Sequence, residues 1–392
     1  MLRGKRLSVL ATLVIVLAVA AWTSPALAKV TIKQKVGDKE FTLQLYGFSQ
    51  LEARAGEGRE GKPPGESGPR FSAQRIRVGF NYFHNGLFSK LFLDFNQSHS
   101  SDEAGLPKMI KDAFVGYRFN DAAFIRIGMI KAPVGMKFTI PGWNMDIVER
   151  NKLDKGMVLE RDMGIMLSGR LIGGPADQKL STSGIEMGHE KWGRGFGYDI
   201  GVFNPAGRSA AVTWDKSVLG DALAYAARIH YDHGLPLHFE ASYGVSEQAG
   251  GPGTEDFKVL DIGINSFLVD GRLHWNAEYI DGKNILGIDG WDQDCLTVTL
   301  AWMFTPTIEG VVRHYAASVT RGDNPELPDT SLGNTYVGFN FYLKPLNPKH
   351  RTLQNHRIQF NYVLTSGDDD GAWTGKWGYQ QEAWLLQWQI KY

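Results

Sequence analysis

The sequence has a single cysteine, Cys295, among its 392 residues. An intrachain disulfide is therefore impossible, and a lone cysteine is more often a packed interior residue than a reactive one. After the N-terminal segment, no apolar run reaches the roughly 18 residues of a membrane-spanning helix. Lysine plus arginine and aspartate plus glutamate both number 42, a balance that argues against a general nucleic-acid-binding protein.

The N-terminal segment has the features of a secretory signal peptide. Basic residues precede a nearly uninterrupted apolar stretch over residues 7–22, and the triplet Ala26-Leu27-Ala28 places small residues where a signal peptidase reads. We expect cleavage after Ala28, so that residues 29–392 form the mature domain of an exported protein. A membrane anchor is the alternative, but the apolar stretch is short for a membrane span.

Alternation of apolar and polar residues is the dominant pattern of the mature sequence. In the last segment Trp384, Leu386, Trp388 and Ile390 alternate with polar residues, which is the period of a strand with one apolar face. The pattern predicts about sixteen strands, near 41–54, 71–83, 87–97, 109–119, 123–131, 163–171, 195–204, 222–232, 236–246, 257–267, 272–281, 294–305, 308–317, 334–344, 353–365 and 380–392.

The connections between these segments alternate between short and long. Short turns such as His84-Asn85-Gly86 separate longer polar loops, which is the arrangement of an up-and-down barrel with one elaborated rim. A soluble sandwich or barrel would turn the apolar faces inward and the polar faces outward. A core enclosed by sixteen strands would need bulky filling, yet the faces opposite the apolar ones carry polar residues. We therefore predict an all-β, transmembrane antiparallel β-barrel with its apolar faces toward lipid and its polar faces inward.

One connection, residues 132–162, is longer than its neighbours and contains Ala132-Pro133-Val134-Gly135 and Pro141-Gly142-Trp143. Loops of this length in compact domains are commonly functional. A barrel of sixteen strands is too wide for its wall alone to select solutes. We expect this segment to fold inward as a constriction loop that narrows the channel.

Four segments of the sequence stand out as motifs: 75–80 (RIRVGF), 111–117 (KDAFVGY), 127–135 (IGMIKAPVG) and 160–169 (ERDMGIMLSG). In this order they resemble the phosphate-selective porin O and P family of Gram-negative outer membranes. Met129 departs from the family pattern, in which glutamine is expected. The resemblance implies a sixteen-stranded homotrimer that passes anions, and Tyr392 resembles the C-terminal signal read by the barrel-assembly machinery.

A channel needs fixed charge in a narrow aqueous space, and arginine suits this role because its fork holds two oxygens of an anion. The alternation places several bases on the inner faces of neighbouring strands, and the long connection adds others. The predicted pore-lining and anion-binding residues are Arg75, Arg77, Lys90, Arg118, Arg126, Lys131, Lys137, Arg150 and Arg161. We expect Arg75, Arg77 and Arg126 to be open charges, while many other bases pair with acids and brace the loop.

These features predict a passive, anion-preferring porin for phosphate or other small anions, with no catalytic residues, no metal and no cofactor. Its expected partners are small anionic solutes, outer-membrane lipid, lipopolysaccharide and the barrel-assembly machinery, with no role for nucleic acid. Three alternatives remain open: a nonspecific diffusion porin, a barrel enzyme such as a lipase or protease, and an adhesin with a plugged lumen. Conductance and a hydrolase assay separate them.

Overall fold

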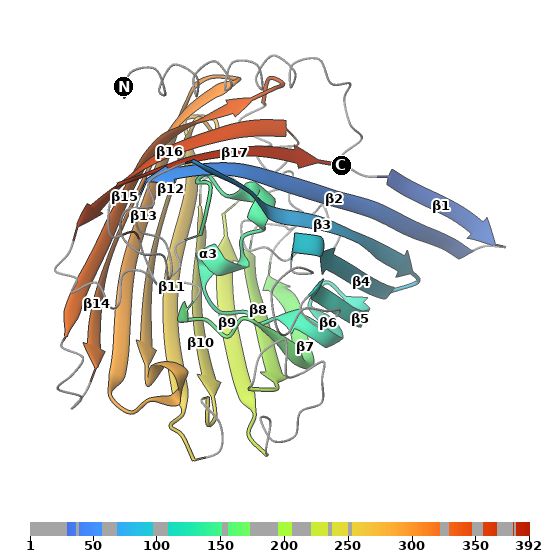
Figure 1. Ribbon diagram of the computed structural model, residues 1–392. Coiled ribbons are helices and arrows are strands. Elements are labelled where there is room, and N and C mark those ends of the chain that lie inside the picture. The colour runs from blue at the N-terminus through green and yellow to red at the C-terminus, as the bar shows by residue number, and fades with distance from the viewer. Residues whose placement is uncertain are drawn as a thin grey trace, which may run out of the picture.

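The structure is a computed structural model, and it describes residues 30–36, 39–56, 69–96, 109–150, 156–172, 195–205, 221–233, 237–249, 253–321, 329–346, 356–366, 379 and 382–392. The predicted signal peptide lies outside these residues. The described part of the chain is an antiparallel barrel: β2 to β17 pair in sequence order, and β17 pairs back with β2 to close the ring (Figure 1). Closure gives every one of these strands two neighbours and leaves no open sheet edge among them.

The strands match the predicted segments closely. Period-two alternation requires an extended backbone, so the pattern located the strands well and their ends less well. They are β2 (Lys39–Gly56), β3 (Arg70–His84), β4 (Leu87–Asp94), β5 (Ile110–Asn120), β6 (Ala123–Lys131), β7 (Arg161–Ile172), β8 (Gly195–Phe203), β9 (Ala224–Asp232), β10 (His238–Ser246), β11 (Phe257–Leu268), β12 (Leu273–Lys283), β13 (Trp291–Thr305), β14 (Ile308–Arg321), β15 (Thr330–Tyr342), β16 (His356–Ser366) and β17 (Ala383–Lys391).

A further strand, β1 (Val30–Val36), was not predicted. It pairs with the first part of β2, from Val36 opposite Lys39 to Val30 opposite Leu45. The pairing of β2 passes from β17 to β1 near Gly47: the N–H of Tyr392 donates to the C=O of Gly47 at 2.9 Å, and the N–H of Gly47 donates to the C=O of Tyr392 at 2.6 Å. The length of β2 explains β1: β2 extends past the end of β17, and β1 covers the edge that β17 leaves unpaired.

The turn between β3 and β4 shows why short connections were easy to recognise. Asn85 and Gly86 both have positive φ, at 46° and 81°. This is the backbone of a two-residue hairpin turn whose twist matches that of its strands, and asparagine followed by glycine adopts it at the least cost.

The outer face of the barrel is apolar, as β13 illustrates. Leu296, Val298, Leu300, Trp302 and Phe304 are exposed, while the residues between them are buried on the inner face. The same alternation recurs on β9, β10, β14 and β15. Exposed apolar rows of this extent are rare on soluble proteins and typical of barrels whose outer surface meets lipid.

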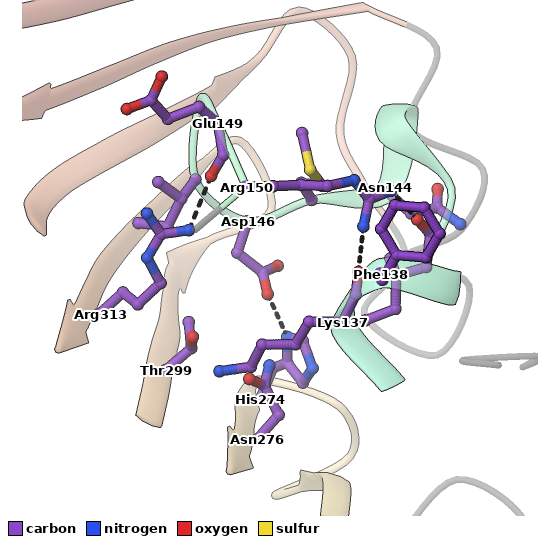
Figure 2. A pocket seen from close by; sticks show the side chains of 13 residues that line it. Lys137, Phe138, Asn144, Asp146, Glu149, Arg150, His274, Asn276, Thr299 and Arg313 are labelled. Atoms are coloured by element: carbon purple, nitrogen blue, oxygen red, sulfur yellow. Dashed lines mark hydrogen bonds and ion pairs between the residues drawn. The ribbon is translucent and has the colours of Figure 1, made fainter. Parts of the chain in front are cut away.

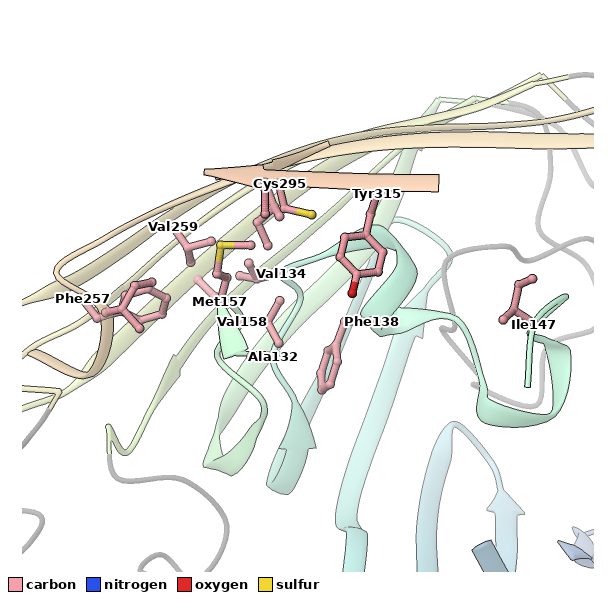
Figure 3. Close-up of a cluster of buried hydrophobic side chains, with 14 of the residues drawn as sticks. Ala132, Val134, Phe138, Ile147, Met157, Val158, Phe257, Val259, Cys295 and Tyr315 are labelled. Atoms are coloured by element: carbon pink, nitrogen blue, oxygen red, sulfur yellow. The ribbon is translucent and has the colours of Figure 1, made fainter. Parts of the chain in front are cut away.

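The inner face, in contrast, is not uniformly polar, which corrects the sequence-based expectation. Figure 3 shows one apolar cluster, in which Val134, Met157 and Val158 of the β6–β7 connection pack beside Val259 of β11 and Cys295 of β13. All five side chains are at most 6% exposed. These inward apolar residues are covered by the connection rather than by water, so they form a small core inside the barrel wall.

A second cluster inside the barrel joins Tyr46, Phe48 and Phe92 to Trp143 of the same connection. The ring of Trp143 meets those of Phe48 and Phe92 edge-on, with centroids 5.1 and 6.0 Å apart. Edge-to-face contacts add to the burial of area and orient both partners.

None of the described helices is long and apolar enough to cross a membrane, a test that does not apply to strands.

Candidate functional site

The connection between β6 and β7 is the long segment expected from the sequence, and its described residues, 132–150 and 156–160, are called the inner loop below. It contains the short helix α3 (Met136–Thr139) and the 3-10 turn η2 (Gly142–Asn144). Figure 1 shows α3 surrounded by the strands of the barrel. At α3 the backbone N–H of Met136 donates to Asp261 of β11 at 3.1 Å, and that of Lys137 to Glu278 of β12 at 2.8 Å.

Past α3, the inner loop is held by a row of amide side chains. This amide row consists of Gln50, Asn340, Gln359, Asn361, Gln387 and Gln389, from β2 and β15 to β17. Each of its side chains makes at least one hydrogen bond to the loop backbone. Gln50 donates to Gly142 O at 3.0 Å, Gln389 to Trp143 O at 3.1 Å, Gln359 to Met145 O and Asp146 O at 3.2 and 3.1 Å, Asn340 to Asp146 O at 2.9 Å and Gln387 to Val148 O at 3.3 Å, while Asn361 accepts from Val148 N at 2.9 Å. Neutral amides, which the sequence-based prediction overlooked, therefore carry much of the bracing that was expected from ion pairs.

One ion pair reinforces this row at its end. Glu149 of the inner loop lies 3.1 Å from Arg54 of β2 and accepts from the hydroxyl of Tyr336 at 3.2 Å. Tyr379, before β17, accepts from Arg54 at 3.2 Å. Burial and the nearby Glu149 carboxylate raise the pKa of Tyr379 well above its usual value, so this phenol stays neutral at physiological pH.

Beside the amide row, on β3, β4, β5 and β7, lies a set of bases called the basic wall below: Arg75, Arg77, Lys90, Lys111 and Arg161. Two aspartates are shared among four of them. Asp94 lies 2.8 Å from Arg77 and 3.8 Å from Lys111, and Asp112 lies 3.2 Å from Lys90 and 2.9 Å from Arg161. Each carboxylate thus faces two cations.

Lys111 belongs to this wall although the sequence reading did not select it. The β4–β5 pairing shifts register between Phe92, opposite Asp112, and Leu93, opposite Ile110. At such a bulge two residues face one, and both Lys111 and Asp112 are buried. Strict alternation would have put consecutive residues on opposite faces, so only the register reveals Lys111.

Arg75 differs from the other bases of the wall. Its guanidinium donates to Gln50 at 2.6 Å and to Gln74, both neutral amides, and no ion pair joins it to an acid in the part of the chain that the structure describes. It also lies against the inner loop, since a Cβ built on Gly142 would stand 3.2 Å from its Nε. The open charge expected at this position stays a prediction, and the side chain sits where loop and wall meet.

The other two arginines expected to be open are ion-paired, which corrects that part of the prediction. Arg77 is bound to Asp94, and Arg126 lies 3.4 Å from Asp199 and donates to Ser168 at 2.7 Å. Asp199 is also bound by Arg228 of β9 at 2.7 Å. A buried base is rarely left without a partner, because desolvation is costly.

The remaining predicted residues fall into two groups. Lys131, Lys137 and Arg150 are tied to main-chain carbonyls of the loop or wall: Lys131 to Phe138 O at 2.8 Å, Lys137 to Thr297 O at 3.0 Å, and Arg150 to Lys137 O and Ile140 O. Arg118 instead pairs with Asp121 at the β5–β6 turn, so it lies at the end of the barrel and not beside the loop.

The shared carboxylate of Asp112 yields a stability prediction. Asp112→Asn leaves Lys90 and Arg161 without their common counter-charge, and both are largely buried. We expect a loss of about 3 kcal/mol in the free energy of unfolding, the scale of breaking a buried pair. Urea titration of the folded barrel in detergent measures it.

Asp121→Asn is the matched control, because its carboxylate is 83% exposed and pairs only with Arg118 among the described contacts. An exposed pair contributes about 0–1 kcal/mol. Equal losses in the two variants would contradict a structural role for the shared aspartate.

A pocket opens between the inner loop and strands β12 to β14, with a volume of about 60 Å³ (Figure 2). Asp146 of the loop reaches His274 of β12 at 2.9 Å across it. Arg313 of β14 donates to Glu149 O at 2.7 Å on one side. The sequence reading did not select Arg313, because a single base on a late strand carries no local signal.

In the described residues no group of three or more histidine, cysteine and acidic side chains is placed to hold a metal ion.

Comparison with known proteins establishes the fold. No protein-family model matches the chain, and no curated protein matches its sequence. Solved structures do match: Salmonella typhi OmpF in complex with daunomycin (12% identity, 90% of this chain and 98% of that one, TM-score 0.62), the trimer form of Vibrio cholerae OmpT (10%, 90% and 99%, 0.56), and the outer membrane channel DcaP of Acinetobacter baumannii (13%, 92% and 99%, 0.56). The chain has the sixteen-stranded barrel fold of outer-membrane porins.

Proposed function

We propose that this chain forms a passive, water-filled channel in the outer membrane of a Gram-negative bacterium and that the channel prefers anions. The closed barrel with an apolar outer face supports membrane insertion. The basic wall supports the preference, and one observation carries it: Asp94 and Asp112 each face two bases, while Arg75 donates to the amides Gln50 and Gln74 in the described part of the chain.

The electrostatic argument is one of focusing. Charges that line a narrow aqueous path between low-dielectric walls act on a passing ion more strongly than the same charges in open water. A wall with excess positive charge lowers the barrier for anions and raises it for cations. In this proposal the inner loop is the constriction of the channel. Gly142 of the loop lies against Arg75 of the basic wall, so that permeating ions pass close to that wall.

Reversal potentials in a salt gradient across a planar bilayer test the proposal. We expect a reversal potential of the sign that reports chloride permeating faster than potassium. Competition of phosphate against chloride in single-channel recordings then tests the phosphate preference that the family resemblance implies. A channel equally permeable to both ions would instead be a nonspecific diffusion porin.

We also propose a homotrimer assembled in the outer membrane after export, with lipopolysaccharide around its apolar belt and the barrel-assembly machinery as its folding partner. The trimer form of OmpT, which shares the fold, supports the oligomeric state. Mass measurement of the detergent-solubilised protein, corrected for bound detergent, tests it, and a monomeric mass contradicts it.

The proposed membrane belt predicts that the loss of stability caused by an arginine substitution depends on its position along β13. A strand needs about 9–11 residues to cross a bilayer, and the exposed apolar row from Leu296 to Phe304 supplies such a stretch. Leu300→Arg, at its centre, is expected to destabilise the barrel by about 2–4 kcal/mol in lipid. Reversible unfolding in liposomes measures this.

Asp294→Arg on the same strand and face is the control, because it lies beyond the apolar row. Near the membrane interface the cost falls to about 0–1 kcal/mol. If the arginine were tolerated equally well at both positions, the belt would not be in contact with lipid.

A further inference from the structure

Gln74 and Arg75 lie next to each other on the inner face of β3. The β2–β3 pairing shifts register beside Gln50, which leaves Gln74 in a bulge. Nη1 of Arg75 donates to Oε1 of Gln50 at 2.6 Å and to Oε1 of Gln74. Two neutral amides from neighbouring strands therefore hold one nitrogen of a half-buried guanidinium.

Both amides are held with their oxygen toward the guanidinium. Nε2 of Gln50 donates to the main-chain oxygen of Gly142 at 3.0 Å, so Oε1 is the atom left for the base. Oε1 of Gln74 also accepts from Nε2 of Gln387 at 2.9 Å, and the same Nε2 donates to Val148 O at 3.3 Å. A main-chain oxygen can only accept, so these contacts fix which end of each amide faces the guanidinium.

An amide oxygen accepts an N–H of a guanidinium without bringing a charge of its own, whereas a carboxylate brings a negative charge that opposes that of the base. Both cases occur on β3, because Arg77 is bound to Asp94 at 2.8 Å. Asp94 and Glu52 act on Arg75 electrostatically. Each of these acids is bonded to another arginine, since Glu52 lies 2.7 Å from Arg54. In the described part of the chain, the hydrogen bonds of Arg75 go to amides alone.

We propose that Gln50 and Gln74 are specificity-determining residues of the channel: they position Arg75 beside the ion path by hydrogen bonds and leave its positive charge to act on passing anions. The inference rests on the proposed channel function and names residues that set its anion preference. Gln50 also binds Gly142 O of the inner loop, so the same side chain fixes the base relative to the constriction. Both are positioning residues, since they act through Arg75 and not on the ion.

The replacement Gln74→Glu tests the neutrality of the amide. Oε1 of Gln74 is the acceptor in both of its side-chain contacts, so a carboxylate of the same size keeps them and adds one negative charge beside the guanidinium. We expect the chloride-over-potassium permeability ratio, from reversal potentials in a salt gradient, to fall about fivefold, the effect of cancelling one arginine's field in the path. Gln74→Leu, similar in size and neutral, should change the ratio less than about twofold, because Gln50 still holds Arg75.

Gln34→Glu is the matched control, because it makes the same change on β1, where the side chain is exposed and β2 has passed the end of β17. It should leave the ratio as in the unaltered protein. An unaltered ratio in Gln74→Glu overturns the proposal. An equal fall in Gln74→Leu also overturns it, because that result shows that the amide matters for packing and not for its neutrality.

A second measurement does not depend on the folding of the glutamate variant. Cys295 is buried, so a thiol reagent added to the reconstituted Gln74→Cys channel reacts at the introduced cysteine. A methanethiosulfonate that carries a sulfonate should lower the ratio about fivefold, one that carries an ammonium should raise it, and an uncharged one should change it little. The unaltered protein, treated in the same way, is the control. Equal effects of the three reagents overturn the proposal.

These recordings also separate this proposal from the proposed function. If the unaltered channel prefers anions and Gln74→Glu does not alter that preference, the assignment of the amides fails and the channel function stands. If the unaltered channel has no anion preference, yet Gln74→Glu makes it prefer cations while Gln74→Leu does not, the anion preference fails and the assignment of the amides stands.

Discussion

Replacing Arg75 and Arg77 together with alanine is expected to reduce the chloride-over-potassium permeability ratio by about tenfold or more. Arg75 is the base of the wall whose described partners are neutral amides, and it lies against Gly142 of the inner loop. A unit charge about 5 Å from an ion contributes about 3 kcal/mol at an effective dielectric constant of 20, and mobile salt reduces this to about 1 kcal/mol per arginine. Removing Arg77 also leaves Asp94 with Lys111 as its remaining base among the ion pairs described.

Reversal potentials in a tenfold salt gradient measure the ratio. Arg75→Ala alone should account for at least half of the change in free energy, because Arg77 is already compensated by Asp94. Arg118→Ala removes an arginine from the end of the barrel and should change little. If selectivity is unaltered in the double variant, the basic wall is not the filter.

Replacing Gln359 and Gln389 together with leucine is expected to release the inner loop from the wall. The two amides make three hydrogen bonds to the carbonyls of Trp143, Met145 and Asp146. At about 1 kcal/mol each, their loss shifts the balance between detached and attached loop by about a hundredfold. Larger and noisier single-channel conductance should follow, with faster hydrogen exchange over residues 141–149.

Gln293→Leu provides the matched control for this pair. Gln293 lies on the inner face of β13, 2% exposed, and its Nε2 has no partner among the described residues, so its replacement should leave the loop attached. The anchoring amides are neutral, so raising the salt concentration should not release the loop of the unaltered protein. A conductance step appearing only at high salt would show that ion pairs hold the loop instead.

The strands of the barrel were predictable because alternation is a local property. Each strand needs one apolar and one polar face, and the 384–392 segment displays this without knowledge of its neighbours. The turn at Asn85-Gly86 was predictable for the same reason, since its residues favour the backbone that the turn requires. β1 alternates too, but its role depends on how far β2 extends past Tyr392.

The charges were predictable as a set but not as partners. Alternation places Arg75, Arg77 and Arg126 on inner faces, yet it does not say which acid stands opposite. The register puts Arg77 opposite Asp94, while Arg126 meets Asp199 two strands away through the curvature of the wall. Among the described residues Arg75 pairs with no acid, and this difference cannot be seen in the sequence, where the three arginines look alike.

The sequence by itself determined that the chain is a barrel with apolar and polar faces, about sixteen strands and one unusually long connection after β6. Periodicity and loop length are local properties that can be read directly from the sequence. Only the tertiary structure decided how that connection is held and which partner each described base binds. The amide row joins β2 to β15, β16 and β17 from opposite ends of the sequence, and the bulge at Lys111 breaks the alternation. Each of these depends on register and closure, which bring together residues that no local pattern connects.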